Sequence, residues 1–206
     1  EEADSIRTMN SKELIDSVKK IMKGINLEGG VWVFGYGSLM WNPDFDVKEK
    51  ISGEVKGYQR SLCLKSMLYR GSPDYYGLVF GLDYGDSCQG MCFRIAPENL
   101  KKELLKLWER EMFAENYIPT WIKVKTKESN ISALTFLINN KHENYVPNLG
   151  IEDIAQRVTK AKGKCGSCID YVMNTIKHLH QSGLRDKYLE KLIKYIDSQK
   201  FSIYSK

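Results

Sequence analysis

The chain has 206 residues, of which 42% are apolar and 28% are charged, with 16 glycines and 5 prolines. This composition excludes disordered, collagen-like and disulfide-scaffold proteins, which depart strongly from it in apolar, glycine or cysteine content. The net charge of +5 comes from lysines interspersed with acidic residues rather than from one basic block, so we expect no nucleic-acid partner. Apolar runs such as 133–138 are far shorter than the ~20 residues of a membrane-spanning helix, so we expect no membrane partner.

Hydrophobic periodicity predicts helices towards both ends of the chain and strands in its middle. Ser11 is the expected N-cap of the first helix, which should end at Gly24. The predicted helices are 11–24, 97–112, 151–161, 167–181 and 185–198, and the predicted strands are 31–34, 61–65, 78–82, 90–95, 121–125 and 132–139. This grouping favours an α+β fold with a mostly antiparallel sheet or small barrel. We expect residues 1–30 to form a helical extension and residues 31–200 a single domain.

The strand at 31–34 runs directly into a glycine turn, Gly35-Tyr36-Gly37-Ser38. Glycines permit positive φ angles and a close approach of backbone to ligand, so successive N–H groups could form an anion-binding nest here. The dinucleotide motif G-x-G-x-x-G and the hydrolase motif G-x-S-x-G both fail, because position 40 is methionine. On spacing alone, a structural turn and a ligand-binding nest both remain open.

The helix predicted at 97–112 carries a carboxylate on its apolar face. That face consists of Leu104, Leu107, Trp108 and Met112, and Glu111 falls inside the same arc. The opposite face should be solvated and consists of Lys102, Lys106, Glu109 and Arg110. Burial would raise the pKa of Glu111, as a general base working near neutral pH requires. Alternatively, Glu111 ends the helix and turns to solvent or pairs with a basic neighbour.

The cysteines predict no metal and no cofactor. Their number, five, is odd in a chain long enough to fold without staples, which favours reduced thiols and a cytoplasmic location. Cys165 and Cys168 have redox or zinc spacing, but no second cysteine pair accompanies them, and on a continuous helix His178 and His180 would lie ~15 Å away. No histidine neighbours a candidate nucleophile in the sequence, so a Ser-His-Asp site has no visible support.

Several motifs, taken in order, resemble the ChaC family of glutathione-specific γ-glutamylcyclotransferases. The resemblance is carried first by 33–39, by Arg110-Glu111-Met112 and by 117–121. It continues through shorter matches at 40–43, 70–71, 77–82, 88–90, 170–172 and 183–186. It covers roughly residues 8–198.

This resemblance implies a cyclotransferase-type β-barrel flanked by helices, which cleaves glutathione to 5-oxoproline and cysteinylglycine without a cofactor. Glu111 would be the catalytic glutamate, and Tyr117 a substrate contact. The loop that holds the γ-glutamyl group would consist of Val33, Phe34, Gly35, Tyr36, Gly37 and Ser38, with Leu39 at its edge. Segments 67–69 and 72–76 differ from the family's usual residues. Another γ-glutamyl peptide or amine, or a non-catalytic sensor role, therefore remains an alternative, and the oligomeric state is not predicted.

Overall fold

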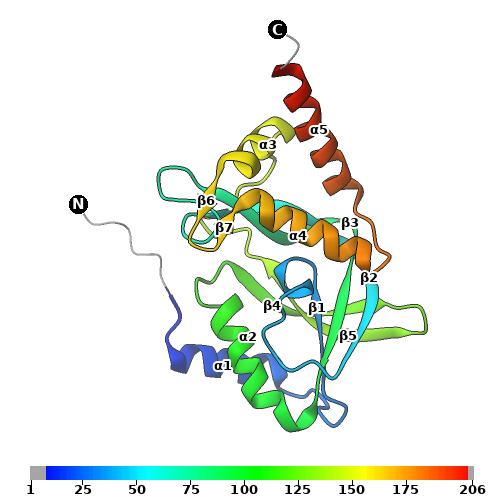
Figure 1. Cartoon of the computed structure of the whole chain (residues 1–206). Coiled ribbons are helices and arrows are strands. Elements are labelled where there is room, and N and C mark those ends of the chain that lie inside the picture. The colour runs from blue at the N-terminus through cyan, green and yellow to red at the C-terminus, as the bar shows by residue number, and fades with distance from the viewer. Residues whose placement is uncertain (1–7, 204–206) are drawn as a thin grey trace. The chain divides into compact units, whose positions relative to one another are not determined.

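The computed structural model describes residues 8–203, with side chains to residue 199, and its central element is a closed five-stranded barrel (Figure 1). The strands follow one another around the barrel in the order β1-β3-β2-β4-β5, and β3 also pairs with β5. Their bounds are β1 (Val31–Gly35), β2 (Glu49–Ser66), β3 (Gly77–Ile95), β4 (Tyr117–Lys125) and β5 (Asn130–Ile138).

The barrel mixes antiparallel and parallel pairing. β1 runs antiparallel to β3, with Gly35 opposite Met91, whereas it runs parallel to β5, with Val33 opposite Leu134. β4 and β5 form a continuous antiparallel ladder from Tyr117 to Lys125. Side chains of β1 and β5 fill the interior, where burial of apolar surface stabilises the closed sheet. The α+β class with a mixed barrel flanked by helices is confirmed.

Strands β2 and β3 are much longer than the sequence predicted. The predicted strands 78–82 and 90–95 are two parts of the 19-residue β3, and 61–65 is the end of the 18-residue β2. The polar segment 83–87, for which the sequence predicted neither helix nor strand, lies within β3. Its backbone continues the ladder with β2, and Tyr84 stacks on Tyr58 of that strand with ring centroids 5.7 Å apart. Pairing with a neighbouring strand thus overrides the local turn preference.

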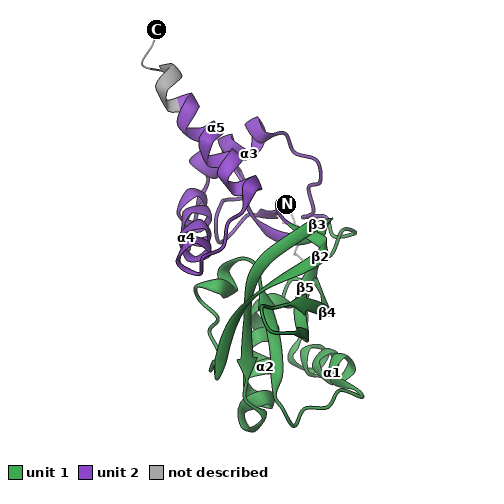
Figure 2. Ribbon diagram, turned by 90° about the vertical axis from the view of Figure 1, so that its right-hand side faces the viewer, with its two compact units in different colours: residues 1–59, 82–142 green, residues 60–81, 143–206 purple. Residues whose placement is uncertain are grey.

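Contacts between alpha-carbons divide the chain into two compact units, coloured separately in Figure 2. The first unit comprises the described residues up to 59 together with 82–142, and the second comprises 60–81 and the described residues from 143 onward. Both units draw on β2 and β3. That residues 31–200 act as one domain stays a prediction.

The first unit contains helices α1 (Ser11–Met22) and α2 (Leu100–Glu111) and the short 3₁₀ helices η1 (Ser38–Met40) and η2 (Pro97–Asn99). The N-cap of α1 is Asn10 rather than the predicted Ser11. The Asn10 side chain accepts hydrogen bonds from the N–H groups of Lys12 and Glu13, and the Glu13 carboxylate accepts one from the Asn10 N–H. Helix α1 packs on α2, where Trp108 Nε1 donates to Ser17 Oγ at 3.0 Å.

The second unit contains α3 (Ile151–Lys160), α4 (Cys168–Gln181) and α5 (Lys187–Ile203). A two-stranded hairpin, β6 (Lys162–Gly163) with β7 (Gly166–Ser167), joins α3 to α4 and was not predicted. Among the helices of residues 8–203, none combines the length and the apolar character needed to cross a membrane.

Candidate functional site

The loop that follows β1 is anchored on the barrel by side chains and by its own backbone. The Tyr36 hydroxyl donates to the carbonyl of Phe136 at 2.7 Å, and the Thr135 hydroxyl donates to the carbonyl of Phe34 at 3.0 Å. The N–H of Met40 then bonds the Gly37 carbonyl at 3.0 Å and closes the turn of η1. These bonds hold the loop in one conformation against β5.

The glycine at position 35 of this loop is explained by close packing and not by a positive φ. Gly37 has φ −131°, and Gly35 is not among the positive-φ glycines, so neither adopts the positive φ that glycine permits. A Cβ at Gly35 would instead lie 3.0 Å from the Leu39 Cβ. The N–H groups of Ser38 and Leu39 precede the first hydrogen-bonded turn of η1, so they have no acceptor within it. These two N–H groups are the candidates for donors of the nest, which stays a prediction.

The predicted loop residues differ in what they can offer a ligand. The side chains of Val33 and Phe34 are fully buried, and Tyr36 is buried with its hydroxyl engaged on β5. Gly35 and Gly37 are also buried, whereas Ser38 is half-buried. A ligand at this loop would therefore meet backbone groups and the Ser38 hydroxyl rather than the aromatic or aliphatic side chains.

Glu111 is the last residue of α2 and lies on its buried face, as the periodicity predicted. Leu104, Leu107 and Trp108 of that face are at most 2% exposed, and the Glu111 side chain is 14% exposed. Burial raises the pKa of the Glu111 carboxyl, and the neighbouring Arg110 guanidinium, 3.1 Å away from Nε to Oε1, lowers it in part. Glu111 therefore lies mostly out of solvent and is paired with a basic neighbour, while Glu109 is exposed.

Arg110 was expected to be solvated, and the structure shows otherwise. Its side chain is 23% exposed, its Nη2 donates to the Ser38 hydroxyl at 2.8 Å, and its Nη1 donates to the Asn42 carbonyl. Periodicity places Arg110 outside the apolar arc correctly, but residues 38–42 cover that side of the helix. Arg110 and Ser38 are 72 residues apart, so no pattern of neighbouring residues could have predicted their hydrogen bond.

Helix α2 carries a further carboxylate, Glu103, whose burial was not predicted from the sequence. It is fully buried, accepts from Lys106 Nζ at 3.1 Å and from the Asp46 N–H at 3.3 Å, and lies 3.6 Å from Lys102 Nζ. Burial alone would raise its pKa, but these hydrogen bonds and the two lysine charges together lower it. Glu103 lies four residues before Leu107 and so on the same face of the helix, and this spacing could have predicted its burial. Helix α2 thus holds the loop after β1 at two places, through Arg110 and through Glu103.

Tyr117 lies in the same unit. It begins β4, opposite Ile138 of β5, and is half-buried. The loop, Glu111 and Tyr117 therefore all belong to the first unit, and Arg110 directly links the first two.

The cysteines of the second unit form no bridge. Cys165 is exposed and unpaired, and Cys168 is buried with its thiol donating to the Leu78 carbonyl at 3.1 Å. Burial raises the pKa of the Cys168 thiol. Within the described part of the chain, no three His, Cys, Asp or Glu side chains gather as a metal site would require.

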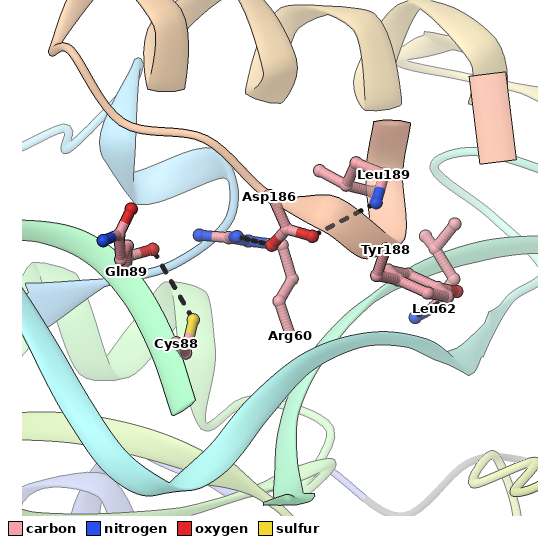
Figure 3. Close-up of polar contacts among 7 residues, drawn as sticks. All are labelled: Arg60, Leu62, Cys88, Gln89, Asp186, Tyr188 and Leu189. Carbon is pink, nitrogen blue, oxygen red and sulfur yellow. Dashed lines mark hydrogen bonds and ion pairs between the residues drawn. The ribbon is translucent and has the colours of Figure 1, made fainter. Parts of the chain in front are cut away.

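The second unit also contains a buried ion pair, drawn in Figure 3. The fully buried guanidinium of Arg60, the residue of β2 at which the second unit begins, bonds Asp186, whose side chain is 14% exposed. The other carboxylate oxygen of Asp186 accepts from the Leu189 N–H at 3.1 Å and so caps α5. Tyr188 adds a further tie, since its hydroxyl accepts from the Leu62 N–H at 3.4 Å. This cluster fastens the start of α5 to β2, which explains why α5 begins at Lys187 and not at the predicted 185.

Comparisons with known proteins agree on one family. Residues 31–199 match the family model described as ChaC-like protein. The chain is 33% identical over 167 residues to the glutathione-specific γ-glutamylcyclotransferase of Escherichia coli, which covers 81% of this chain and 72% of that protein. It is 31% identical over 171 residues to γ-glutamylcyclotransferase 2-3 of Arabidopsis thaliana, covering 79% and 86%. The crystal structure of a γ-glutamyl cyclotransferase specific to glutathione from yeast superposes with a TM-score of 0.75 at 19% identity, covering 82% of this chain and 96% of that one, and supports the fold.

Proposed function

The chain belongs to the ChaC-like family, and we propose that it is a γ-glutamylcyclotransferase that cleaves glutathione to 5-oxoproline and cysteinylglycine. The observation that carries the proposal is Glu111, a buried carboxyl of raised pKa, joined through Arg110 to the loop after β1. The curated relatives from E. coli, zebrafish and human named as glutathione-specific cyclotransferases support the choice of substrate.

Glu111 acts as the general base. The α-amine of the γ-glutamyl group attacks its own γ-amide carbonyl carbon and closes a five-membered ring. At neutral pH this amine is an ammonium, so a proton must leave it before attack, and the Glu111 carboxylate accepts that proton. The resulting carboxylic acid then donates the proton to the leaving amide nitrogen as the C–N bond breaks, and the ring nitrogen loses its second proton to solvent to leave the lactam N–H. Because the attack is intramolecular, holding the substrate in the right geometry can supply as much as ~7–11 kcal/mol of the barrier.

The loop after β1 holds the γ-glutamyl group and stabilises the developing charge. The carbonyl oxygen becomes negative in the transition state, and the N–H groups of Ser38 and Leu39 are donors suited to it, each worth about 3–4 kcal/mol. Val33, Phe34, Gly35, Tyr36 and Gly37 shape this loop from the barrel side, and Tyr117 contributes a substrate contact.

The reaction requires neither a metal nor a nucleotide, since the substrate supplies its own nucleophile. The partner is the small-molecule substrate, and we place the activity in the cytoplasm, where the five free thiols would stay reduced.

The test is to incubate the protein in parallel with glutathione and γ-glutamyl-alanine and to follow 5-oxoproline and the released peptide or amino acid by mass spectrometry. We expect cysteinylglycine from glutathione and little turnover of γ-glutamyl-alanine. Glu111→Gln should keep glutathione binding and lose turnover by about 10²–10⁴-fold, whereas the exposed Glu109→Gln should match the unmodified protein.

Other outcomes would refute parts of the proposal. Preferred cleavage of γ-glutamyl-alanine would make the chain a cyclotransferase for another γ-glutamyl compound. Tight calorimetric binding of glutathione without any product would make it a sensor. Near-normal turnover by Glu111→Gln would remove Glu111 as the base.

A further inference from the structure

The Arg110 guanidinium contacts three different groups of the first unit with its three nitrogens. Nε lies 3.1 Å from Glu111 Oε1, Nη2 donates to the Ser38 hydroxyl at 2.8 Å, and Nη1 donates to the Asn42 carbonyl. Guanidinium is planar and rigid, so these three contacts share one plane and one orientation. The Glu111 carboxylate and residues 38 and 42 are therefore all bonded to this one side chain.

We infer that Arg110 is the positioning residue of this site, which holds the Glu111 carboxylate and the loop after β1 in fixed register with each other. The inference rests on the proposed function for its meaning in catalysis. The base and the N–H donors act on different atoms of the substrate, so the distance between them must stay fixed. A misplacement of either by about 1 Å can lower the rate by about 100-fold. A loop anchored only to the barrel would not meet that requirement with respect to α2.

The surroundings of Glu111 support a second, electrostatic part of this role. Across the described residues, Arg110 is the charged group whose field acts on Glu111. The loop facing it contributes Ser38, which is uncharged, and Glu109 projects away into solvent. Burial raises the pKa of Glu111 and the Arg110 charge lowers it, so loss of that charge must move the pKa of Glu111 further upward.

The experiment compares Arg110→Gln, which removes both the positive charge and the guanidinium group, with Arg110→Lys. The lysine keeps the charge but cannot contact Glu111, Ser38 and Asn42 at once. Arg94→Gln is the matched control, because Arg94 lies in the same unit, is 30% exposed and likewise joins a carbonyl and a carboxylate, Gly29 at 2.7 Å and Glu49 at 3.3 Å. Each variant is checked by circular dichroism, and kcat, KM and the pH dependence of kcat/KM are measured with glutathione. Glu111 is also titrated directly by NMR on protein labelled with ¹³C-glutamate.

Both Arg110 variants should lose about 100-fold in kcat with little change in KM. The acidic limb of the pH profile should move to higher pH in Arg110→Gln and stay near its original place in Arg110→Lys. Arg94→Gln should leave kcat, KM and the limb unchanged. If Arg110→Gln does not fold, the kcat of Arg110→Lys and its NMR titration decide the question.

The inference is overturned if folded Arg110 variants change only KM, which would make Arg110 a substrate ligand, or if they change nothing beyond what Arg94→Gln changes. Failure of the proposed function is a separate result. If the unmodified protein turns over no γ-glutamyl compound, the NMR titration still reports whether Arg110 sets the pKa of Glu111.

Discussion

Replacing Gly90, a residue of barrel strand β3, by alanine should shift the proposed substrate loop that follows β1. Gly90 lies in β3 beside Met91, the residue that pairs with Gly35. A Cβ at position 90 would lie 2.5 Å from the Gly35 carbonyl oxygen and 2.7 Å from the Phe34 ring. Backbone oxygen and a fully buried ring cannot rotate away, so β1 itself must move.

The size of this displacement follows from the contact distances. Moving the Gly35 oxygen from 2.5 Å to an ordinary contact of 3.4 Å requires a shift of about 0.9 Å at the residue where the loop begins. Overpacking of this kind costs about 1–3 kcal/mol of stability. A shift of about 1 Å in the loop relative to Glu111 should lower kcat by about 100-fold, a much larger effect than the stability loss alone would cause in a folded protein.

The assay combines urea unfolding with release of 5-oxoproline from glutathione under conditions where the variant is folded. Gly150→Ala is the matched control, because Gly150 has φ −64° and its added Cβ would meet nothing closer than Asp153 Oδ2 at 3.8 Å. That variant should keep full activity and change the unfolding free energy by no more than about 1 kcal/mol, because the entropy lost from the unfolded chain is offset by alanine being a poorer N-cap of α3. A Gly90→Ala protein with unchanged kcat would show that β3 relaxes without moving the loop, and the packing argument would be wrong.

Three further predictions concern capping, thiol reactivity and acid stability. Asn10→Ala should lower the unfolding free energy by about 1 kcal/mol and Ser11→Ala should leave it nearly unchanged, as measured by urea unfolding, because Asn10 forms the capping box. Peptide mapping after iodoacetamide treatment of the native protein should find the exposed Cys165 labelled and Cys92 unlabelled, since burial raises the pKa of Cys92 to about 12; equal labelling would contradict the buried position. The lowered pKa of Glu103 contributes stability that is present above its unfolded-state pKa and lost as the pH falls through its folded-state value, so Glu103→Gln should be less stable than the unmodified protein at pH 7 but not near pH 3.

The helical part of the site could be predicted because its signal is local. The face of α2 repeats within the helix itself, so Leu104, Leu107 and Trp108 place Glu111 on the buried side without any knowledge of the barrel. The same periodicity correctly predicts that Glu109 is exposed. It also places Glu103, four residues before Leu107, on the buried face, although this was not predicted. The spacing of apolar residues determines which face of a helix is buried. The fold determines only which other element that face packs against.

The role of the loop after β1 stays a prediction, but the structure distinguishes between the two uses of glycine that the spacing left open. Glycine permits both a positive φ and a close approach of backbone, and at Gly35 the structure uses the close approach, to Leu39. Spacing of glycines identifies a tight place in the backbone but does not distinguish a turn from close packing, because both need the absence of a Cβ.

The sequence by itself determined the α+β class, the helix that carries Glu111, the glycine loop and the family resemblance. These depend on periodicity and motif, which are properties of neighbouring residues. Only the tertiary structure decided that segment 83–87 continues β3, and that Arg110 joins Ser38 to Glu111 across 72 residues of chain. Strand pairing and ion pairing are made between segments distant in sequence, so their energies appear only once the chain has closed the barrel.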